Sequence, residues 1–175
     1  TRTNPVIEPC HDCDTARSPA SSAYLLQIER TPMSVIESTG VVTASVTVPG
    51  ETIPRVAFLP VTVDLLRKLW DQYGPLMIHQ SGGCCDGSSP MCFPAGDFLT
   101  SDQDVLLGRL DIAPTGGDPQ VIDFWMSAEQ FEYWSHTFLT VDVVKGRGSG
   151  FSVEAPEGVR FMIRSRLMQT VTPFM

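Results

Sequence analysis

A nine-residue alternation near the end of the chain constrains the fold most strongly. Between Val159 and Leu167 the apolar residues share one face of an extended strand and the arginines share the other, with Val159, Phe161, Ile163 and Leu167 on the first face and Arg160, Arg164 and Arg166 on the second. This pattern is typical of an antiparallel strand that is buried on one side. The arginine face could bind an acidic partner, although a solvated strand face explains it equally well.

Several other short strand patterns occur, and turn residues separate them. Strands are predicted at Leu76–Gln80, Val105–Ile112, Val121–Met126 and Phe138–Val144. The turn-rich stretch 114–119 predicts a hairpin with a long loop between the second and third of these. Strands outnumber helices and no β-α-β rhythm occurs, so we predict a β-rich α+β fold with mixed or antiparallel sheets and two short helices.

Both predicted helices have start or stop signals. Thr62 is expected to cap a helix with Val63, Leu66, Trp70 and Tyr73 on its apolar face, which Gly74-Pro75 would end. Ser127-Ala128-Glu129-Gln130 has the form of a capping box, and it predicts a second helix from about Ala128 to Ser135. The aromatic residues around this helix, Phe124, Trp125, Phe131, Tyr133 and Trp134, are interpreted as core rather than as a binding cage.

We expect the folded core to span residues 55–175 as a single domain, and residues 1–54 to be a partly flexible N-terminal extension. The first 22 residues are rich in Pro, Ser, Thr and charge, while Tyr24–Ile28 and Val41–Val48 could be strands. The chain begins at Thr1 without an initiator methionine, so a trimmed or mis-started product is one interpretation. The pair Cys10 and Cys13 flanks His11 and forms half of a metal site or a redox motif, or belongs to an unstructured tail.

Composition excludes several classes of protein. The formal net charge of −8 argues against binding to a nucleic-acid backbone, which needs clustered positive charge. No apolar run approaches the roughly 20 residues of a membrane span, and no export signal is visible, so a cytoplasmic protein is expected. Five cysteines is an odd number, and without export it favours free thiols or metal ligands over a disulfide framework.

The densest cluster of reactive side chains lies in a glycine-rich loop. His79 precedes Gly82-Gly83-Cys84-Cys85, and Cys92 follows within the same short segment. Thiolates and imidazole suit iron, iron–sulfur centres and zinc, and the backbone N–H groups around Gly82 and Gly83 could stabilise sulfur charge. The alternative is that the cysteines are small buried hydrophobes and the glycines only form a turn.

His136 is the second candidate nitrogen ligand. It follows the predicted second helix, and Glu132 lies one turn earlier, where its carboxylate could orient the imidazole. The alternative is that His136 only caps the end of the helix. We find no motif of a serine hydrolase, a phosphate-binding loop, a zinc protease or a dinucleotide-binding fold, so no catalytic residue is predicted.

The segment from Arg55 to Leu167 resembles a known family. Gly74 to Cys92, Gln130 to Val144 and Gly146 to Phe161 carry a resemblance to the bacterial domain-of-unknown-function 779 family, whose genes often lie beside aldehyde or alcohol dehydrogenases. That resemblance implies an accessory role near aldehyde metabolism.

A more distant similarity is to the HesB-like, A-type iron–sulfur carrier proteins. On that analogy Cys84 stands at the first ligand cysteine, and Gly148 to Pro156, with Gly148 and Gly150 as cofactor-binding residues, matches the glycine-phenylalanine turn. The carriers end in a C-x-C motif, whereas no cysteine follows Cys92 here. Cys85 and Cys92 would have to compensate.

Three hypotheses from different classes follow. The first is a small non-catalytic protein that binds iron, an iron–sulfur centre or zinc through Cys84, Cys85 and Cys92, with His79 or His136 as nitrogen ligand. The second is a thiol redox or aldehyde-reactive protein that uses Cys84 or Cys85 as nucleophile. The third is a metal-free module that docks on a dehydrogenase, and a homodimer is compatible with each.

Overall fold

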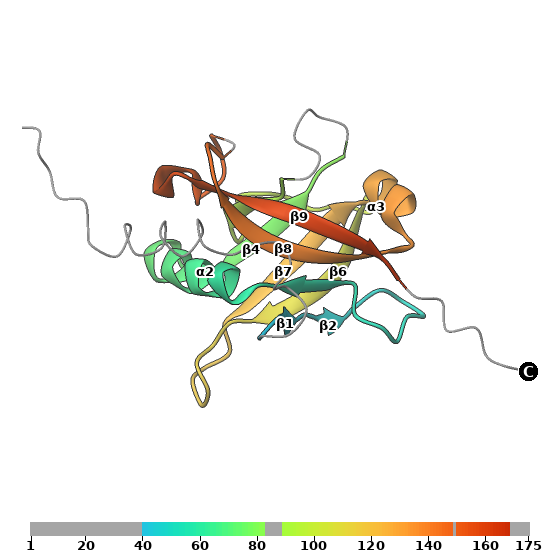
Figure 1. Cartoon of the computed structure of the whole chain (residues 1–175), viewed down its shortest axis with the longest axis horizontal. Coiled ribbons are helices and arrows are strands. Elements are labelled where there is room, and N and C mark those ends of the chain that lie inside the picture. The colour runs from blue at the N-terminus through green and yellow to red at the C-terminus, as the bar shows by residue number, and fades with distance from the viewer. Residues whose placement is uncertain (1–39, 83–88, 149, 169–175) are drawn as a thin grey trace, which may run out of the picture.

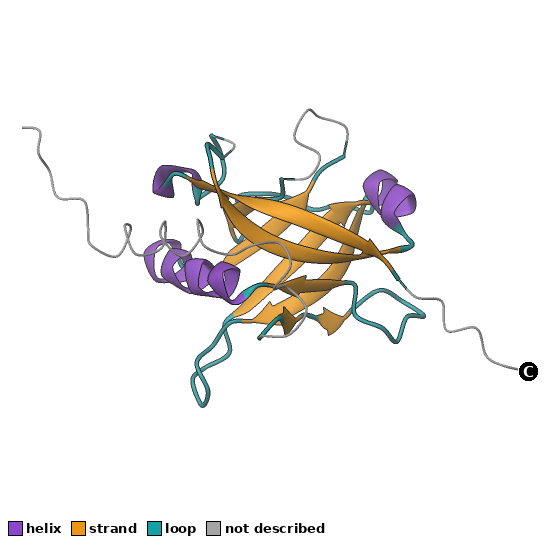
Figure 2. Cartoon of the chain, viewed as in Figure 1, coloured by secondary structure: helices purple, strands orange, loops and turns teal. Residues whose placement is uncertain are grey.

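The computed structural model describes residues 40–82, 89–148 and 150–168. Strands dominate this part of the chain (Figure 2). In chain order the elements are β1 (Val42–Thr43), β2 (Ser45–Val46), β3 (Val56–Phe58), α2 (Pro60–Tyr73), β4 (Leu76–Gln80), β5 (Met91–Pro94), β6 (Asp104–Asp111), β7 (Val121–Ser127), α3 (Ala128–Trp134), β8 (Thr137–Lys145), the 3₁₀ turn η2 (Ala155–Glu157) and β9 (Val159–Leu167).

The strands form two mixed sheets. The four-stranded sheet has the order β1-β3-β8-β9 and the five-stranded sheet the order β2-β6-β7-β4-β5 (Figure 1). β3 pairs with β8 and β4 pairs with β7 in parallel, and the other pairs are antiparallel. The β-rich α+β prediction is confirmed. The two parallel pairs join segments far apart in the sequence, and α2 connects strands of different sheets, so no local β-α-β rhythm signals them.

One hydrophobic core draws side chains from both sheets and from α2. Phe58 of β3 and Phe124 of β7 meet edge to face across it, with ring centroids 6.0 Å apart. Phe161 of β9 is also fully buried. Because opposing sheets contribute these rings, the two sheets are packed face to face on one core.

The helix predicted at residues 62–73 is present, but it begins earlier and is not capped as expected. Pro60 starts α2 after Leu59, which makes no side-chain capping bond. Thr62 lies inside the helix, buried, and its hydroxyl donates to the carbonyl of Val141 at 2.9 Å. Proline at the first helical position supplies a preset φ, so α2 starts there without a capping side chain. Gly74, with φ +77°, ends α2 as predicted.

Local patterns account well for α3 and β9. Ser127 caps α3, and its hydroxyl accepts the N–H of Gln130 at 3.4 Å. Val159, Phe161 and Ile163 of β9 are buried, as their alternation predicts. Four predictions of burial are wrong. Leu167 is 70% exposed because β9 ends there, Tyr133 is 77% exposed on α3, and Tyr73 is 43% exposed at the end of α2. Trp125 is only partly buried, because Phe124 and Met126 occupy the core face of β7.

The described chain before Arg55 joins both sheets. β1 pairs with β3 and β2 pairs with β6, while Ala44 between them is buried in the core. The expected domain boundary at residue 55 therefore falls after two short strands. The predictions for Cys10, Cys13 and Tyr24–Ile28 lie outside the described residues. Among the helices that are described, none has the length and apolar character to cross a membrane.

Gly108 offers a test of the packing between β2, β3 and β6. A Cβ atom at this position would lie 2.8 Å from Cβ of Ala44 and 3.1 Å from Cγ1 of Val56. Gly108→Ala should therefore lower the free energy of unfolding by about 1–3 kcal/mol through overpacking, measured by chemical denaturation. Gly150→Ala is the control, because nothing lies within 4 Å of its added Cβ. Equal effects of the two variants would contradict this packing.

Candidate functional site

The alternation of β4 divides its side chains between the two faces of the five-stranded sheet. Ile78 points into the core, and its cross-strand partner Cys92 points there too. His79 follows Ile78 and therefore points to the opposite face. It is only 3% exposed, since the ring of Phe98 covers it at a centroid distance of 4.4 Å. The last residue of β4, Gln80, leads directly into the glycine-rich loop.

His79 is held by a carboxylate from the start of β6. Its Nε2 lies 2.8 Å from Oδ1 of Asp104. Because a carboxylate only accepts hydrogen bonds, Nε2 carries the proton and donates it. The second carboxylate oxygen of Asp104 accepts the backbone N–H of Ser101 at 2.9 Å. Asp104 is thereby fixed in position, and it fixes the ring of His79 in turn.

The other ring nitrogen of His79 faces the loop. Nδ1 lies 3.1 Å from the hydroxyl oxygen of Ser81, the first residue after β4. When the ring is neutral and Nε2 carries the proton, Nδ1 is a hydrogen-bond acceptor, and the Ser81 hydroxyl donates to it. The pair Asp104–His79 therefore places the unprotonated ring nitrogen beside Ser81, at the start of the loop that contains Cys84 and Cys85. These two cysteines and Gly83 lie outside the described residues.

The ionisation of Asp104 is consistent with this arrangement. Partial burial raises the pKa of the Asp104 carboxyl, but the hydrogen bonds from His79 and Ser101 outweigh it, and the pKa lies below its ordinary value. Asp104 is thus an anion at neutral pH, and its charge favours a proton on Nε2.

Cys92 lies in a different environment from His79. Its side chain is fully buried in the hydrophobic core. Burial raises the pKa of the Cys92 thiol well above its ordinary value, and the nearby carboxyl of Glu154 adds to the effect. A protonated, buried thiol is a weak nucleophile and a poor metal ligand. Since Cys92 and His79 point to opposite faces of the sheet, the structure does not bring these two predicted ligands together.

A buried polar cluster connects β5 to the segment before β9. The hydroxyl of Ser152 accepts the backbone N–H of Cys92 at 2.8 Å and hydrogen-bonds the carboxyl of Glu154. Glu154 is 1% exposed. Burial raises its pKa from 4.5 to about 7, although the bond from Ser152 acts in the opposite direction. This cluster joins the end of the glycine- and cysteine-rich segment, at Cys92, to the glycine-phenylalanine turn of residues 148–156.

Three of the four predicted cofactor-binding glycines lie in described residues. A Cβ atom on Gly148 would lie 3.1 Å from Oε1 of Glu154, so the absence of a side chain lets this loop approach the buried carboxyl. Gly82 lies against the start of α3, where an added Cβ would be 3.2 Å from Oε1 of Gln130. Nothing lies within 4 Å of an added Cβ on Gly150. Gly82 and Gly148 therefore have structural reasons to be glycine.

His136 lies at the other end of α3 from Gly82. It follows the C-terminal end of the helix on the surface, in an open concavity of about 460 Å³ that Glu129, Glu132 and Tyr133 also line. The seven residues of α3 correspond to roughly 10 Å of helix, which separates His136 from the loop entrance. Of the two predicted nitrogen ligands, His79 is the one beside the loop.

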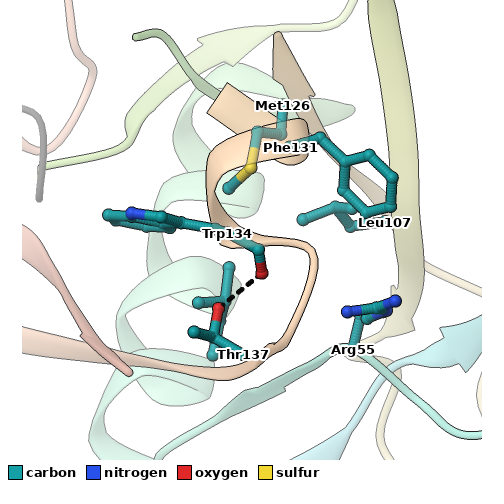
Figure 3. A pocket seen from close by; sticks show the side chains of 7 residues that line it. Arg55, Leu107, Met126, Phe131, Trp134 and Thr137 are labelled. Carbon is teal, nitrogen blue, oxygen red and sulfur yellow. Dashed lines mark hydrogen bonds between the residues drawn. The ribbon is translucent and has the colours of Figure 1, made fainter. Parts of the chain in front are cut away.

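The crevice beneath α3 is not a ligand site. Figure 3 shows Arg55, Phe131 and Trp134 around it, and its volume is about 10 Å³. Such a space holds at most about one water molecule. Within residues 40–82, 89–148 and 150–168, no three side chains of the types His, Cys, Asp and Glu form a group that could hold a metal ion.

Asp104, Ser152 and Glu154 were not singled out from the sequence. Asp104 lies 25 residues after His79, and no spacing rule connects them. The motif around Glu154 was noted for its glycines and Phe151, but a buried carboxyl cannot be told from a surface one by sequence alone. Only the pairing of β4 with β7, and of β7 with β6, brings Asp104 to His79.

Comparison with known proteins gives one match. The model of a family described as a domain of unknown function, DUF779, matches residues 65–167, which is more than half of the chain. The match runs from within α2 to the end of β9. No curated protein and no solved structure matches the chain.

The buried carboxyl of Glu154 predicts a particular pH dependence of stability. Unfolded chains release this proton near pH 4.5, whereas the folded chain holds it up to about pH 7, so the group's contribution to stability is lost as pH rises between these values. The difference between the two pKa values, 4.5 and about 7, corresponds to about 3 kcal/mol of the free energy of unfolding. Glu154→Gln should abolish this loss, so its stability relative to wild type should rise by about 2–3 kcal/mol between pH 4.5 and pH 8 in denaturation experiments. Glu129→Gln, at an exposed position, is the control, and parallel pH profiles for wild type and Glu154→Gln would contradict the prediction.

Proposed function

The chain belongs to the DUF779 family, and from that premise we propose that it is a small non-catalytic protein that binds iron, an iron–sulfur centre or zinc at its Gly82-Gly83-Cys84-Cys85 loop. The observation that carries the proposal is the orientation of His79. Asp104 holds one ring nitrogen, and the other faces the first residue of the loop. A histidine that ligates a metal usually donates its second N–H to a carboxylate in this way.

The donor atoms suit the proposed metals. Thiolates from Cys84 and Cys85 together with an imidazole nitrogen from His79 form a set of soft and borderline ligands, which zinc and iron accept. Cys92 is not part of this proposal, because its thiol is buried on the other face of the sheet. His136 is also left out, since α3 lies between it and the loop entrance. Backbone N–H groups of the loop would complete the environment of the sulfur atoms.

Two further parts of the proposal rest on resemblance. The likeness to HesB-like carriers would make the protein a carrier or holder of an iron–sulfur centre. In its support, the two segments that carry the likeness meet, because the Ser152 hydroxyl accepts the backbone N–H of Cys92 in β5. The family resemblance gives an aldehyde or alcohol dehydrogenase as the partner that the protein would serve.

The metal proposal predicts which variants lose metal. Protein purified without oxygen should contain stoichiometric metal by elemental analysis, and Cys84→Ser with Cys85→Ser should remove it. Asp104→Asn keeps the size of the side chain but weakens the orientation of His79, so metal affinity should fall by about 10- to 100-fold in competition with a chelating dye.

His136→Gln is the matched histidine control and should leave metal content and affinity unchanged. Thermal denaturation of each variant shows whether a loss of metal merely follows a loss of fold. Metal-free wild-type protein in which Cys84 and Cys85 are both freely alkylated would overturn the proposal.

The same Asp104–His79 pair favours a second candidate function. A histidine whose ring is oriented by a carboxylate can act as a base toward a nearby thiol, and the thiolate can then react with an aldehyde or a disulfide. In this alternative Cys84 or Cys85 is the nucleophile and no metal is required. The third alternative is a metal-free module for a dehydrogenase, which uses the loop only for its shape. In that case the Cys84→Ser and Cys85→Ser variants would still bind the dehydrogenase.

The thiol hypothesis predicts that one loop cysteine is alkylated unusually fast. One of Cys84 and Cys85 should react with iodoacetamide at pH 7 faster than a free thiol in an unfolded peptide, because the base lowers the energy of its thiolate. Asp104→Asn should slow this reaction, while Cys92 should stay unmodified in the folded protein because it is buried. Mass spectrometry of trypsin-digested samples taken over time measures each rate. Uniformly slow loop cysteines in metal-free protein would exclude this alternative.

A further inference from the structure

The outer face of the four-stranded sheet contains a row of paired residues that the metal proposal does not use. Thr43 of β1 is paired with Ala57 of β3, Ala57 with Thr140 of β8, and Thr140 with Arg164 of β9. Residues paired in register lie on the same face of a sheet. The neighbouring β8 residues Leu139 and Val141 point into the core, so this row points away from it.

This row crosses a groove with a volume of about 560 Å³. Ala57, the smallest residue of the row, is fully buried and contributes to the lining of the groove. A second pair, Phe138 and Arg166, extends the groove along β8 and β9. The residues that line this β8–β9 groove are Val41, Thr43, Ala57, Phe138, Thr140, Arg164, Ser165 and Arg166. Its volume is within the range of clefts that bind ligands.

Both arginines are held in place by neighbours. Arg164 donates from Nε and Nη2 to one oxygen of Asp142, at 2.8 and 2.6 Å. Arg166 lies over the ring of Phe138, with its guanidinium carbon 4.6 Å from the ring centroid. Asp142 offsets much of the charge of Arg164, so Arg166 supplies most of the net positive charge. When a guanidinium stacks on an aromatic ring, the N–H groups along the edge of the guanidinium stay free. They can bind a carboxylate in the plane of the guanidinium.

The positive charge of this groove is opposite in sign to the net charge of the protein. The chain has a formal net charge of −8, which repels anions at long range. Arg166, beside Arg164 whose charge Asp142 partly offsets, creates a local exception on this face. The charge pattern of the groove is therefore complementary to an acidic ligand, and not to a nucleic acid, whose backbone needs a broad basic surface.

The spacing of the arginines indicates the form of the ligand. Arg164 and Arg166 are two residues apart on β9, and residues i and i+2 of a strand lie roughly 6.6 Å apart. Acidic side chains at alternate positions of another extended segment have the same spacing. The hydroxyl of Thr43, which is exposed, can bond carboxylate oxygens or the backbone of such a segment.

We propose that the β8–β9 groove binds an extended acidic segment of a partner protein, with carboxylates at alternate positions contacting Arg164 and Arg166. Such a contact would use a different sheet from the Asp104–His79 pair. Binding and metal content are therefore independent, and either proposal can fail without the other.

The test uses the full-length protein and a fluorescent peptide of the sequence Gly-Glu-Thr-Glu-Thr-Glu-Gly. Fluorescence anisotropy should show saturable binding that weakens with added salt. Arg166→Glu should weaken binding by roughly tenfold, because it replaces an attraction with a repulsion. Arg147→Glu, at an exposed loop position outside the groove, makes the same change in net charge and should leave the affinity within about twofold.

Three further measurements distinguish an extended acidic segment from other ligands of the groove. A peptide with the same composition but adjacent glutamates should bind several-fold more weakly, and addition of the alternating peptide should shift the amide resonances of Thr43, Thr140 and Arg164 in NMR spectra. Equal weakening by Arg147→Glu and Arg166→Glu would overturn the proposal. So would equal competition by succinate or inorganic phosphate, which would leave only a small-anion site.

The chain's own N-terminal residues and a second copy of the chain are the remaining occupants. If Arg166→Glu alone, without peptide, shifted the amide resonances of residues 1–39 or changed the oligomeric state in sedimentation, the groove would be filled by the protein itself and the partner proposal would be wrong. Unchanged spectra in that region, together with the loss of peptide binding, support it.

Discussion

Packing of the two sheets on one hydrophobic core determines where polar side chains can lie. Each strand alternates, so a residue next to a core residue must point to the other face. Ile78 lies in the core and His79 therefore lies outside it, where Asp104 and Phe98 can reach the ring. The same rule puts Cys92 in the core and Arg164 on an outer face. The candidate sites follow from this alternation rather than from any single motif.

Local signals predicted local structure well. The capping box at Ser127 and the alternation of Val159–Leu167 involve residues close in sequence, and the structure has α3 and β9 at these places. The end of burial along β9 was not predictable, because the exposure of Leu167 depends on where the neighbouring strand stops. Likewise, α2 begins at Pro60 and not after Thr62. The side chain of Thr62 is buried and bonds Val141, so it does not cap the helix.

The candidate site was only half visible in the sequence. His79 could be named because it stands next to a loop rich in glycine and cysteine. Its partner Asp104 is brought to it by the parallel pair of β4 and β7, which depends on contacts that no short window contains. The separation of Cys92 from His79 depends on a different pairing, that of β4 with β5, which puts Cys92 in register with Ile78. Sequence spacing suggested one cluster of ligands, whereas strand alternation divides it.

If Asp104 holds His79 so that Nδ1 can bind a ligand at the loop, NMR of the imidazole nitrogens will detect that binding. Long-range ¹H–¹⁵N spectra of the full-length protein, recorded during a titration with Zn²⁺, report each ring nitrogen separately. We expect the resonance of His79 Nδ1 to shift on metal binding while Nε2 keeps its proton and its bond to Asp104. A titration in which neither nitrogen of His79 changes, with or without metal bound elsewhere, would contradict it.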